Sequence, residues 1–451
     1  MSDGFQSSAS AGQVVELTLI ERLAEFKPAS DIFVVNRTSG NDRGVAELIN
    51  LMGNHGSLFY KSPTAGRNKG STGFIACDDT IIIKVNSQWD QRGGTNTDLL
   101  KALIQAIADH PDGFVGEIIL ADNGQAQYGS TGKGGSLDYS RNNAEDISQS
   151  VQKVVDSFAD YKVSTYLWDN ITTKRVNEYS EDNVEDGYVT NASVNPRTGA
   201  IVAYPKFKTK FGTYISFKLG VWNPGTQSYD SDRLKVINVP VVKSHMGFGV
   251  TASVKHYMGV TSDKLTGQLG ARAHNTVGTG GMGTEMVETR FPILNIVDAI
   301  WVNANPRGGP GTPYYAATRT NVIAASTDPV ALDYWAAKNI LLQAPHNRGY
   351  SDISSMDPDN TAPRAFGQWL RLSMQEISRA GYQTTVDEAH MNVYISQLQT
   401  ATLTPTPTQG PTVPPRDMNW TYIVAIIASV VLVMVTVSII VTRKKRQGRK
   451  G

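Results

Sequence analysis

The sequence predicts an α/β fold: a mostly parallel sheet with flanking helices, an antiparallel insertion and a C-terminal transmembrane helix. Three observations support this. Apolar strands alternate with amphipathic helices from Thr80 to Trp168, a pattern typical of parallel strands joined by right-handed crossovers. Short strands in hairpin-like pairs replace that alternation near residues 185–220. The uncharged stretch 420–441 is long enough to span a bilayer.

The parallel part begins with Thr80–Val85, a continuous apolar strand of the kind found in sheets covered on both faces. A helix follows, and either Thr95 or Thr97 is placed to cap it. The next expected elements are strand Gly116–Ala121, helix Ala144–Tyr161 and strand Val163–Trp168. We assign residues 71–345 to this α/β domain. Residues 1–70 form a lead-in with helix Val14–Phe26, strand Ile32–Asn36 and helix Ala46–Met52.

The second half of the domain contains a segment without periodicity, Asp263–Thr284, which we predict to be a long loop over the ligand site. Asp328 and Pro329 form a strong helix start, because aspartate caps free N–H groups and proline suits the first turn. Strands are expected at Phe291–Val302 and Asn321–Ala325. Residues 346–400 are predicted to form a helical layer, with helices Phe366–Ile377 and Val386–Leu398.

The stretch Leu234–Val260 combines a buried strand with a cluster of basic residues. Its β-branched run predicts the strand, and Pro240 within the run indicates an edge position or a strand end. Ligands of open α/β sheets bind in the crevice beyond the carboxyl ends of the strands, so we place the candidate site here. The polar residues that follow the strand, the last two in a helix-like segment, are Lys243, Ser244, His245, Lys255 and His256.

Lys243, His245 and Lys255 are the candidate catalytic residues. Lysines attract phosphate or carboxylate groups as point charges, and a histidine exchanges protons near neutral pH. The candidate ligand-binding residues at this and neighbouring strand ends are Lys84, Asn86, Ser244, Asp122 and Asp298. A plainer interpretation stays open, in which the lysines are solvated and His245 only ends a strand.

A metal site is the second alternative for the same residues. It would use His245 and His256 with Asp122 or Asp298, a ligand set that suits zinc, iron or manganese. The nearby lysines would repel a cation, so we assign no metal ligand. The single cysteine, Cys77, excludes an intramolecular disulfide and an all-cysteine cluster.

The last 51 residues predict a membrane anchor. Residues 401–419 are rich in proline and threonine and form an extended stalk, 420–441 form the transmembrane helix, and 442–451 form a basic tail. The tail favours a cytoplasmic position for itself and an extracytoplasmic one for the globular part. The N-terminal residues have no basic region or long apolar stretch of an export signal, so two alternatives stay open: the true start lies upstream, or the chain is tail-anchored with its bulk in the cytosol.

The charge balance disfavours nucleic acid as a partner. Six of the 42 basic residues lie in the tail, which leaves 36 against 41 acidic residues in the rest of the chain. Nucleic-acid-binding domains carry a clear basic excess. The expected partners are therefore the membrane and an anionic small molecule.

From about Thr80 to Leu342 the chain resembles the DUF362 family, whose members share an α/β domain without an assigned function. The family's Lys-x-Asn motif is matched by Lys84-Val85-Asn86. Its most specific block is matched by Val239–His245 and then Thr251–Gly259, and its Ser-x-Asp-Pro block by Ser326–Asp333. The chain departs from the family at Ser244, usually threonine, at His256, usually asparagine, and in the loop Asn305–Pro310, which lacks the usual glutamate.

The resemblance supports the fold and the site more than an activity. We predict a membrane-anchored protein that holds an anionic small molecule at the strand ends, with acid/base chemistry as a possible addition. The alternatives are a non-catalytic surface module that binds a ligand or a partner, and a metal-dependent redox enzyme. Many relatives carry cysteine-rich ferredoxin segments, and this chain has none, so it would lack its own iron–sulfur cluster. The sequence assigns no cofactor.

Overall fold

The computed structural model describes residues 29–125, 134–308, 310–344, 349 and 351–399. The helix expected at Val14–Phe26 and the stalk, transmembrane helix and basic tail expected at 401–451 lie outside these ranges. Within them, no helix has the length and apolarity needed to cross a bilayer.

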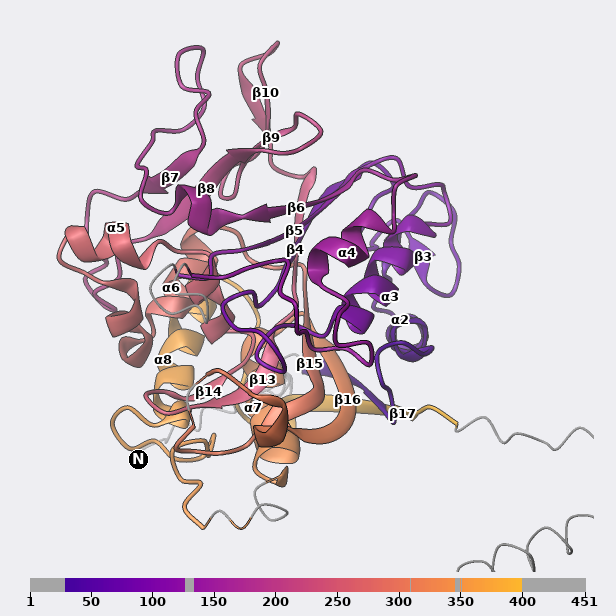
Figure 1. Cartoon of the computed structure of the whole chain (residues 1–451), viewed down its shortest axis with the longest axis vertical. Helices are drawn as coiled ribbons and strands as arrows, with labels where there is room; N and C mark the ends of the chain where they lie inside the picture. The colour runs from indigo at the N-terminus through magenta and orange to yellow at the C-terminus, as the bar shows by residue number, and fades with distance from the viewer. Residues whose placement is uncertain (1–28, 126–133, 309, 345–348, 350, 400–451) are drawn as a thin grey trace, which may run out of the picture. The chain divides into compact units, whose positions relative to one another are not determined.

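A large mixed sheet forms the centre of the fold (Figure 1). Its strands, in spatial order, are β17 (Met391–Gln397), β1 (Ser30–Asn36), β16 (Thr318–Ser326), β15 (Leu294–Asn303), β12 (Leu234–Asn238), β4 (Thr80–Lys84), β5 (Glu117–Asp122) and β6 (Val163–Leu167). The run from β15 to β6 is parallel, while β16 is antiparallel to both of its neighbours. The predicted α/β class and mainly parallel sheet are confirmed.

Both faces of this sheet are covered, which explains why its strands are apolar without alternation. Successive residues of β4 point to opposite cores: Ile81 and Ile83 join one, and Ile82 joins the other. The first core includes α2 (Gly44–Asn54), α3 (Thr97–Ala108) and α4 (Val151–Asp156). The second includes α6 (Gly281–Glu288), α7 (Pro329–Ala336) and α8 (Phe366–Arg379).

The predicted antiparallel insertion is confirmed and extends further than expected. It is a separate sheet of β7 (Gly187–Thr190), β8 (Ala203–Lys208), β9 (Tyr214–Ser216), β10 (Gly220–Asn223) and β11 (Ser228–Asp230). It packs on the second core through aromatic residues, and the ring centroids of Trp168 and Phe217 lie 5.6 Å apart. Other short elements in the described residues include β2 (Tyr60–Lys61), β3 (Lys69–Gly70), single-turn helices at Trp168–Ile171, Tyr314–Ala316 and Glu388–His390, and a π-helical turn at Ala337–Leu341.

Pro240 marks the end of a central strand. The long strand β15 pairs first with β12, at Leu294 and Asn295, and then with β13 (Val241–His245), at Asp298 and Asn303. Strand β12 therefore ends at Asn238, and the chain starts a new strand, β13, at Val241. Strands β13 and β14 (Gly249–Thr251) form a hairpin beyond the end of β12. The helix-like segment is a 3₁₀ helix, η2 (Lys255–Gly259).

The predicted loop at Asp263–Thr284 is wrong, because most of this segment is helical. It forms α5 (Asp263–Gln268), the 3₁₀ helix η3 (Ala273–Thr279) and the start of α6. Ser262 caps α5 by accepting a hydrogen bond from the Leu265 N–H at 3.1 Å. The first two helices are too short to display a helical repeat in the sequence.

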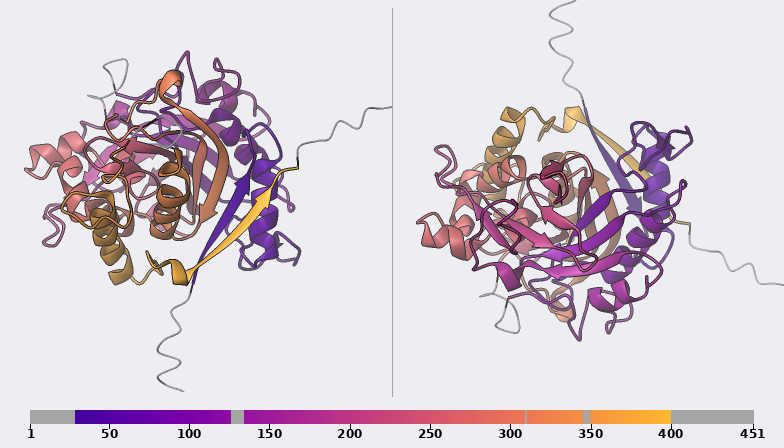
Figure 2. Two further views of the ribbon diagram at one scale, coloured as in Figure 1. Left: turned by 90° about the horizontal axis from the view of Figure 1, so that it is seen from below. Right: turned by 90° about the horizontal axis from the view of Figure 1, so that it is seen from above.

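The helix predicted at Val386–Leu398 is also wrong. The segment forms β17, which pairs in parallel with β1 along its whole length and lies beside it at the edge of the sheet (Figure 2). Valine, tyrosine and isoleucine at 393–395 favour a strand, and pairing with β1 outweighs the weak helical spacing.

Two helix starts also differ from the prediction. Asn96, and neither threonine, caps α3: its Oδ1 accepts hydrogen bonds from the N–H groups of Asp98 and Leu99, both at 3.0 Å. The helix predicted at Ala144–Tyr161 is shorter in the structure, where only α4 is helical and begins after its cap, Ser150. The predicted cap at Asp328 with Pro329 in the first turn of α7 is confirmed.

Candidate functional site

The parallel strands β4 and β5 end side by side, and their last residues form a buried ion pair. Lys84 Nζ lies 2.6 Å from Asp122 Oδ1 and donates a hydrogen bond to the Val85 carbonyl at 3.1 Å. The other carboxylate oxygen, Asp122 Oδ2, accepts from Ser87 N at 2.8 Å and from Ser87 Oγ at 3.0 Å. Burial lowers the pKa of Lys84 and the Asp122 carboxylate opposes that shift. The charge of this lysine is therefore compensated within the protein.

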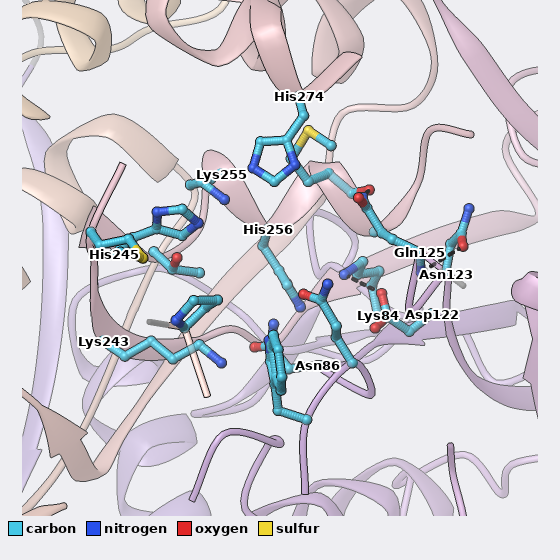
Figure 3. A pocket seen from close by; sticks show the side chains of 17 residues that line it. Lys84, Asn86, Asp122, Asn123, Gln125, Lys243, His245, Lys255, His256 and His274 are labelled. Atoms are coloured by element: carbon cyan, nitrogen blue, oxygen red, sulfur yellow. Dashed lines mark hydrogen bonds and ion pairs between the residues drawn. The ribbon is translucent and has the colours of Figure 1, made fainter. Parts of the chain in front are cut away.

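A cavity of about 380 Å³ lies beyond these strand ends (Figure 3). That volume is at the low end of the range for small-molecule sites. The lining residues come from five regions: the ends of β4 and β5, the β13–β14 hairpin, η2, η3 and the loop after β15. The lining residues are Lys84, Asn86, Gln88, Trp89, Asp122, Asn123, Gln125, Lys243, His245, Met246, Thr251, Lys255, His256, Met258, Gly259, His274 and Pro310.

Lys243 reaches the cavity from β13 and is almost completely buried. Its Nζ donates a hydrogen bond to the Gly93 carbonyl at 2.6 Å. Burial is the main cause that lowers the pKa of Lys243 to about 7, and the nearby Lys255 charge adds to it. An ammonium group has three donors, so this single contact leaves two for a ligand.

Lys255 reaches the cavity from the first position of η2. The backbone just before it is held by Asp333, whose carboxylate accepts hydrogen bonds from the N–H groups of Ser253 at 2.6 Å and Val254 at 2.8 Å. Its Nζ lies 5.3 Å from the ring centroid of Phe248. Among the described residues, no hydrogen-bond acceptor or carboxylate contacts this ammonium group. Burial lowers the pKa of Lys255 to about 7.

His245 is held as a neutral ring. Its Nδ1 accepts a hydrogen bond from the Gly247 N–H at 3.1 Å, so a neutral ring carries its proton on Nε2. Burial, followed by the Lys255 charge and then His274, lowers the pKa of His245 to about 2. The ring centroid of His274 lies 6.0 Å from that of His245, and burial lowers the pKa of His274 to about 4. At neutral pH, His245 therefore offers a hydrogen-bond donor rather than a cation.

His256 is oriented by an amide network beneath the cavity. Asn238 Nδ2 donates to the Ser253 carbonyl at 3.0 Å and to Asn295 Oδ1 at 2.9 Å, so its Oδ1 accepts from His256 Nδ1 at 2.7 Å. Burial holds the pKa of His256 well below its usual range. Its Nε2 has no hydrogen-bond partner within the part of the chain that the structure describes.

The structure brings six of the eight predicted site residues to the cavity wall. They are Lys84, Asn86, Asp122, Lys243, His245 and Lys255. Asn86 also anchors the hairpin, because its Oδ1 accepts from the Val241 N–H at 2.8 Å.

Ser244 and Asp298 do not line the cavity. Ser244 lies between Lys243 and His245 on a strand, where successive side chains point to opposite faces. Asp298 is fully buried and accepts hydrogen bonds from Asn96 N at 2.8 Å and Asn143 Nδ2 at 3.2 Å. Asp298 thus holds the start of α3, and burial raises its pKa to about 6.

Several lining residues were not predicted from the sequence. His274 lies in the segment expected to cover the site, and a third histidine so close to the first two was a usable signal. Asn123 and Gln125 follow Asp122 directly: Asn123 Nδ2 donates to Tyr188 Oη at 2.8 Å, and Gln125 Nε2 donates to the Met258 carbonyl. No sequence pattern distinguishes these two amides from ordinary turn residues.

The metal alternative requires a cluster of ligands. In the described ranges, no group of three or more histidine, cysteine, aspartate or glutamate residues is close enough to hold an ion. His256 Nδ1 is occupied by Asn238, and Asp298 faces α3. The described residues of the cavity thus present lysines and neutral histidines.

Comparison with known proteins gives one match. The family model of a domain of unknown function, DUF362, matches residues 225–338. The predicted resemblance is confirmed over this stretch, which contains Lys243, His245 and Lys255, while the Lys84–Asn86 motif lies outside it. No curated protein and no solved structure matches the chain.

Proposed function

We propose, from the premise that residues 225–338 carry a DUF362 domain, that the chain binds an anionic small molecule in the cavity at the strand ends. The ligand is a phosphate or a carboxylate, and Lys243 and Lys255 are its cationic contacts. Acid/base chemistry through His245 is part of the proposal.

The observation that carries the proposal is the position of Lys255. A buried cation without a partner is unfavourable, and proteins pair such charges with an anion or release the proton. Lys255 lines the cavity, has no acceptor or carboxylate among the described residues, and stands near Lys243, another cation. A ligand carboxylate or phosphate supplies the missing negative charge.

Unsatisfied polar atoms on the same wall support a polar ligand. Four atoms, Trp89 Nε1, Thr251 Oγ1, Gln125 Oε1 and His256 Nε2, are buried and have no hydrogen-bond partner in the described residues. Buried polar atoms are normally paired, so four on one cavity favour a bound molecule with donors and acceptors of its own.

His245 would act on the bound anion through Nε2–H. A negative charge beside the ring raises its pKa toward the neutral range, so the ring can take up a proton and donate it to the ligand. The non-catalytic alternative is favoured by the low pKa of His245 in the cavity as it stands. Under that alternative the ligand binds and leaves unchanged.

The membrane remains a proposed partner on sequence grounds alone. The apolar stretch 420–441 and the basic tail support a single-pass anchor with the globular part outside the cytoplasm. Protease treatment of intact cells tests this, because an outside domain is degraded, whereas survival of the whole chain contradicts the orientation.

Calorimetric titration of the full chain with benzoate, phenylpyruvate and inorganic phosphate tests the binding proposal. We expect Lys243→Met and Lys255→Met each to weaken binding about 10- to 100-fold, as for the loss of a charged hydrogen bond. Lys206→Met is the matched control, because Lys206 is buried in β8 and does not line the cavity. Unchanged affinity in both cavity variants contradicts the proposal. Product analysis after incubation with each bound probe separates turnover from binding alone.

A further inference from the structure

The three cavity lysines differ in the contacts that their amino groups make within the protein. Lys84 is paired with Asp122, and Lys243 donates to the Gly93 carbonyl. Lys255 alone makes neither kind of contact within the residues that the structure describes. Its amino group is therefore the one left for chemistry with a ligand.

The surroundings of Lys255 favour the neutral amine. The ring of Phe248, 5.3 Å from its Nζ, favours the cation, whereas the burial of Lys255 and the largely apolar side chains of Trp89, Met246 and Met258 on the same cavity wall favour the neutral amine. Burial lowers the pKa of Lys255 to about 7. The Asp263 charge opposes this shift, and the Lys84 charge adds to it. Lysines that form Schiff bases are activated in this way, by an apolar pocket or a neighbouring cation.

We infer that Lys255 is a nucleophilic amine that forms an imine with the carbonyl carbon of an oxo acid, whose carboxylate is held by Lys243. This inference rests on the proposed function, since it names the class of anion that the same cavity takes. The apolar side chains on the wall favour an oxo acid with an apolar arm.

The step is balanced without any further reactant. The Nζ lone pair attacks the carbonyl carbon, a C–N bond forms, and the carbonyl electron pair moves to oxygen. A proton passes from nitrogen to that oxygen and gives a carbinolamine. Loss of the hydroxyl group with a second proton releases one water and leaves the C=N bond. His245 Nε2–H, Thr251 Oγ1 and His256 Nε2 are the cavity groups able to donate or accept these protons.

Borohydride trapping tests the inference on the full chain, with phenylpyruvate as the probe and peptide mass mapping as the readout. Reduction of the imine adds the mass of the oxo acid less one oxygen atom to the modified lysine. At neutral pH an exposed lysine is almost entirely protonated, so we expect labelling of Lys255 to exceed that of exposed Lys264 by at least about tenfold. Lys255→Met removes the label.

Two measurements on the unmodified chain separate this inference from the proposed function, because calorimetry reports phenylpyruvate binding and borohydride trapping reports the imine. Lys255→Arg keeps a positive charge at the position and has no primary amine, so we expect it to lose the trapped adduct. Binding by the unmodified chain without an adduct, or an adduct on Lys243 instead, overturns the inference and leaves the anion site intact. Absence of both binding and adduct overturns both. Mapping of the unmodified chain needs no variant, so a folding defect in Lys255→Met does not affect this outcome.

Discussion

Lys84 Nζ lies 2.6 Å from Asp122 Oδ1, and the two side chains are almost completely buried at the ends of adjacent parallel strands. The pair is part of the cavity wall, yet its charges cancel. The uncompensated positive charge of the described wall therefore comes from Lys243 and Lys255. This division explains how one site can hold three lysines and still favour a small anion.

Asp122→Asn is expected to destabilise the fold by about 3 kcal/mol, because it leaves the buried Lys84 cation without its partner. The amide oxygen of the introduced asparagine can still accept from Ser87, so the loss reports the charge pair. The double variant Lys84→Met with Asp122→Asn should recover most of the stability, since no buried charge remains. Urea unfolding followed by tryptophan fluorescence measures both. A single variant that loses less than about 1 kcal/mol contradicts this role.

Gly259→Ala is expected to disrupt the same pair. A Cβ at position 259 would lie 2.0 Å from Asp122 Oδ1 and 2.3 Å from Lys84 Nζ, so the two side chains would have to move apart. We expect a loss of about 1–3 kcal/mol, measured as a lower Tm. Gly278→Ala is the control, because nothing lies within 4 Å of a Cβ there. Equal Tm values for the two variants would show that the close approach of Gly259 is unimportant.

The sheet and much of the cavity wall were predictable from local patterns. Buried parallel strands are apolar throughout, and their carboxyl ends share one edge, so Lys84, Asp122 and Lys243 could be placed near one another from their positions after strands. Lys255 could be predicted as a site residue because it lies in the stretch that resembles the DUF362 family.

The remaining features depend on contacts that no local pattern encodes. Lys243 and Lys255 look alike in the sequence, and they differ because the Gly93 carbonyl, 150 residues away in the chain, reaches only one of them. Ser244 faces away because of strand alternation. His274 is brought in by η3, a helix too short to show a periodic repeat.

Asp333→Asn is expected to weaken ligand binding through Lys255. The Asp333 carboxylate accepts two backbone N–H groups just before Lys255, and an amide oxygen with its NH₂ neighbour can replace only one of those contacts. We expect about a tenfold loss in benzoate affinity by calorimetry. Asp328→Ala is the control: it removes the cap of α7 and lowers stability by about 0.5–2 kcal/mol, and benzoate affinity should not change. If the two variants bind benzoate alike, Asp333 has no special influence on Lys255.

Benzoate binding is expected to weaken as the pH rises through about 7. Burial lowers the pKa of both Lys243 and Lys255 to about 7 in the empty cavity, and a bound carboxylate raises them again. Below that pH both lysines are already protonated, so they add no further pH dependence. Above it, binding requires proton uptake, so Kd rises by up to about tenfold per pH unit for each lysine until the pKa of the bound state is reached.

In the empty cavity, burial holds the pKa of His245 at about 2 and that of His274 at about 4, so both rings are neutral over the pH range in which the two lysines titrate. Benzoate also stays ionised, which removes the ligand as a source of protons. Calorimetry in buffers of different ionisation enthalpy measures the uptake directly. Lys255→Arg should lower the slope by about one proton, because arginine stays charged. A Kd that is constant from about pH 6 to 9 would contradict the assignment of these two lysines as the anion-binding groups, since an anion held by groups with a pKa near 7 must be bound with proton uptake.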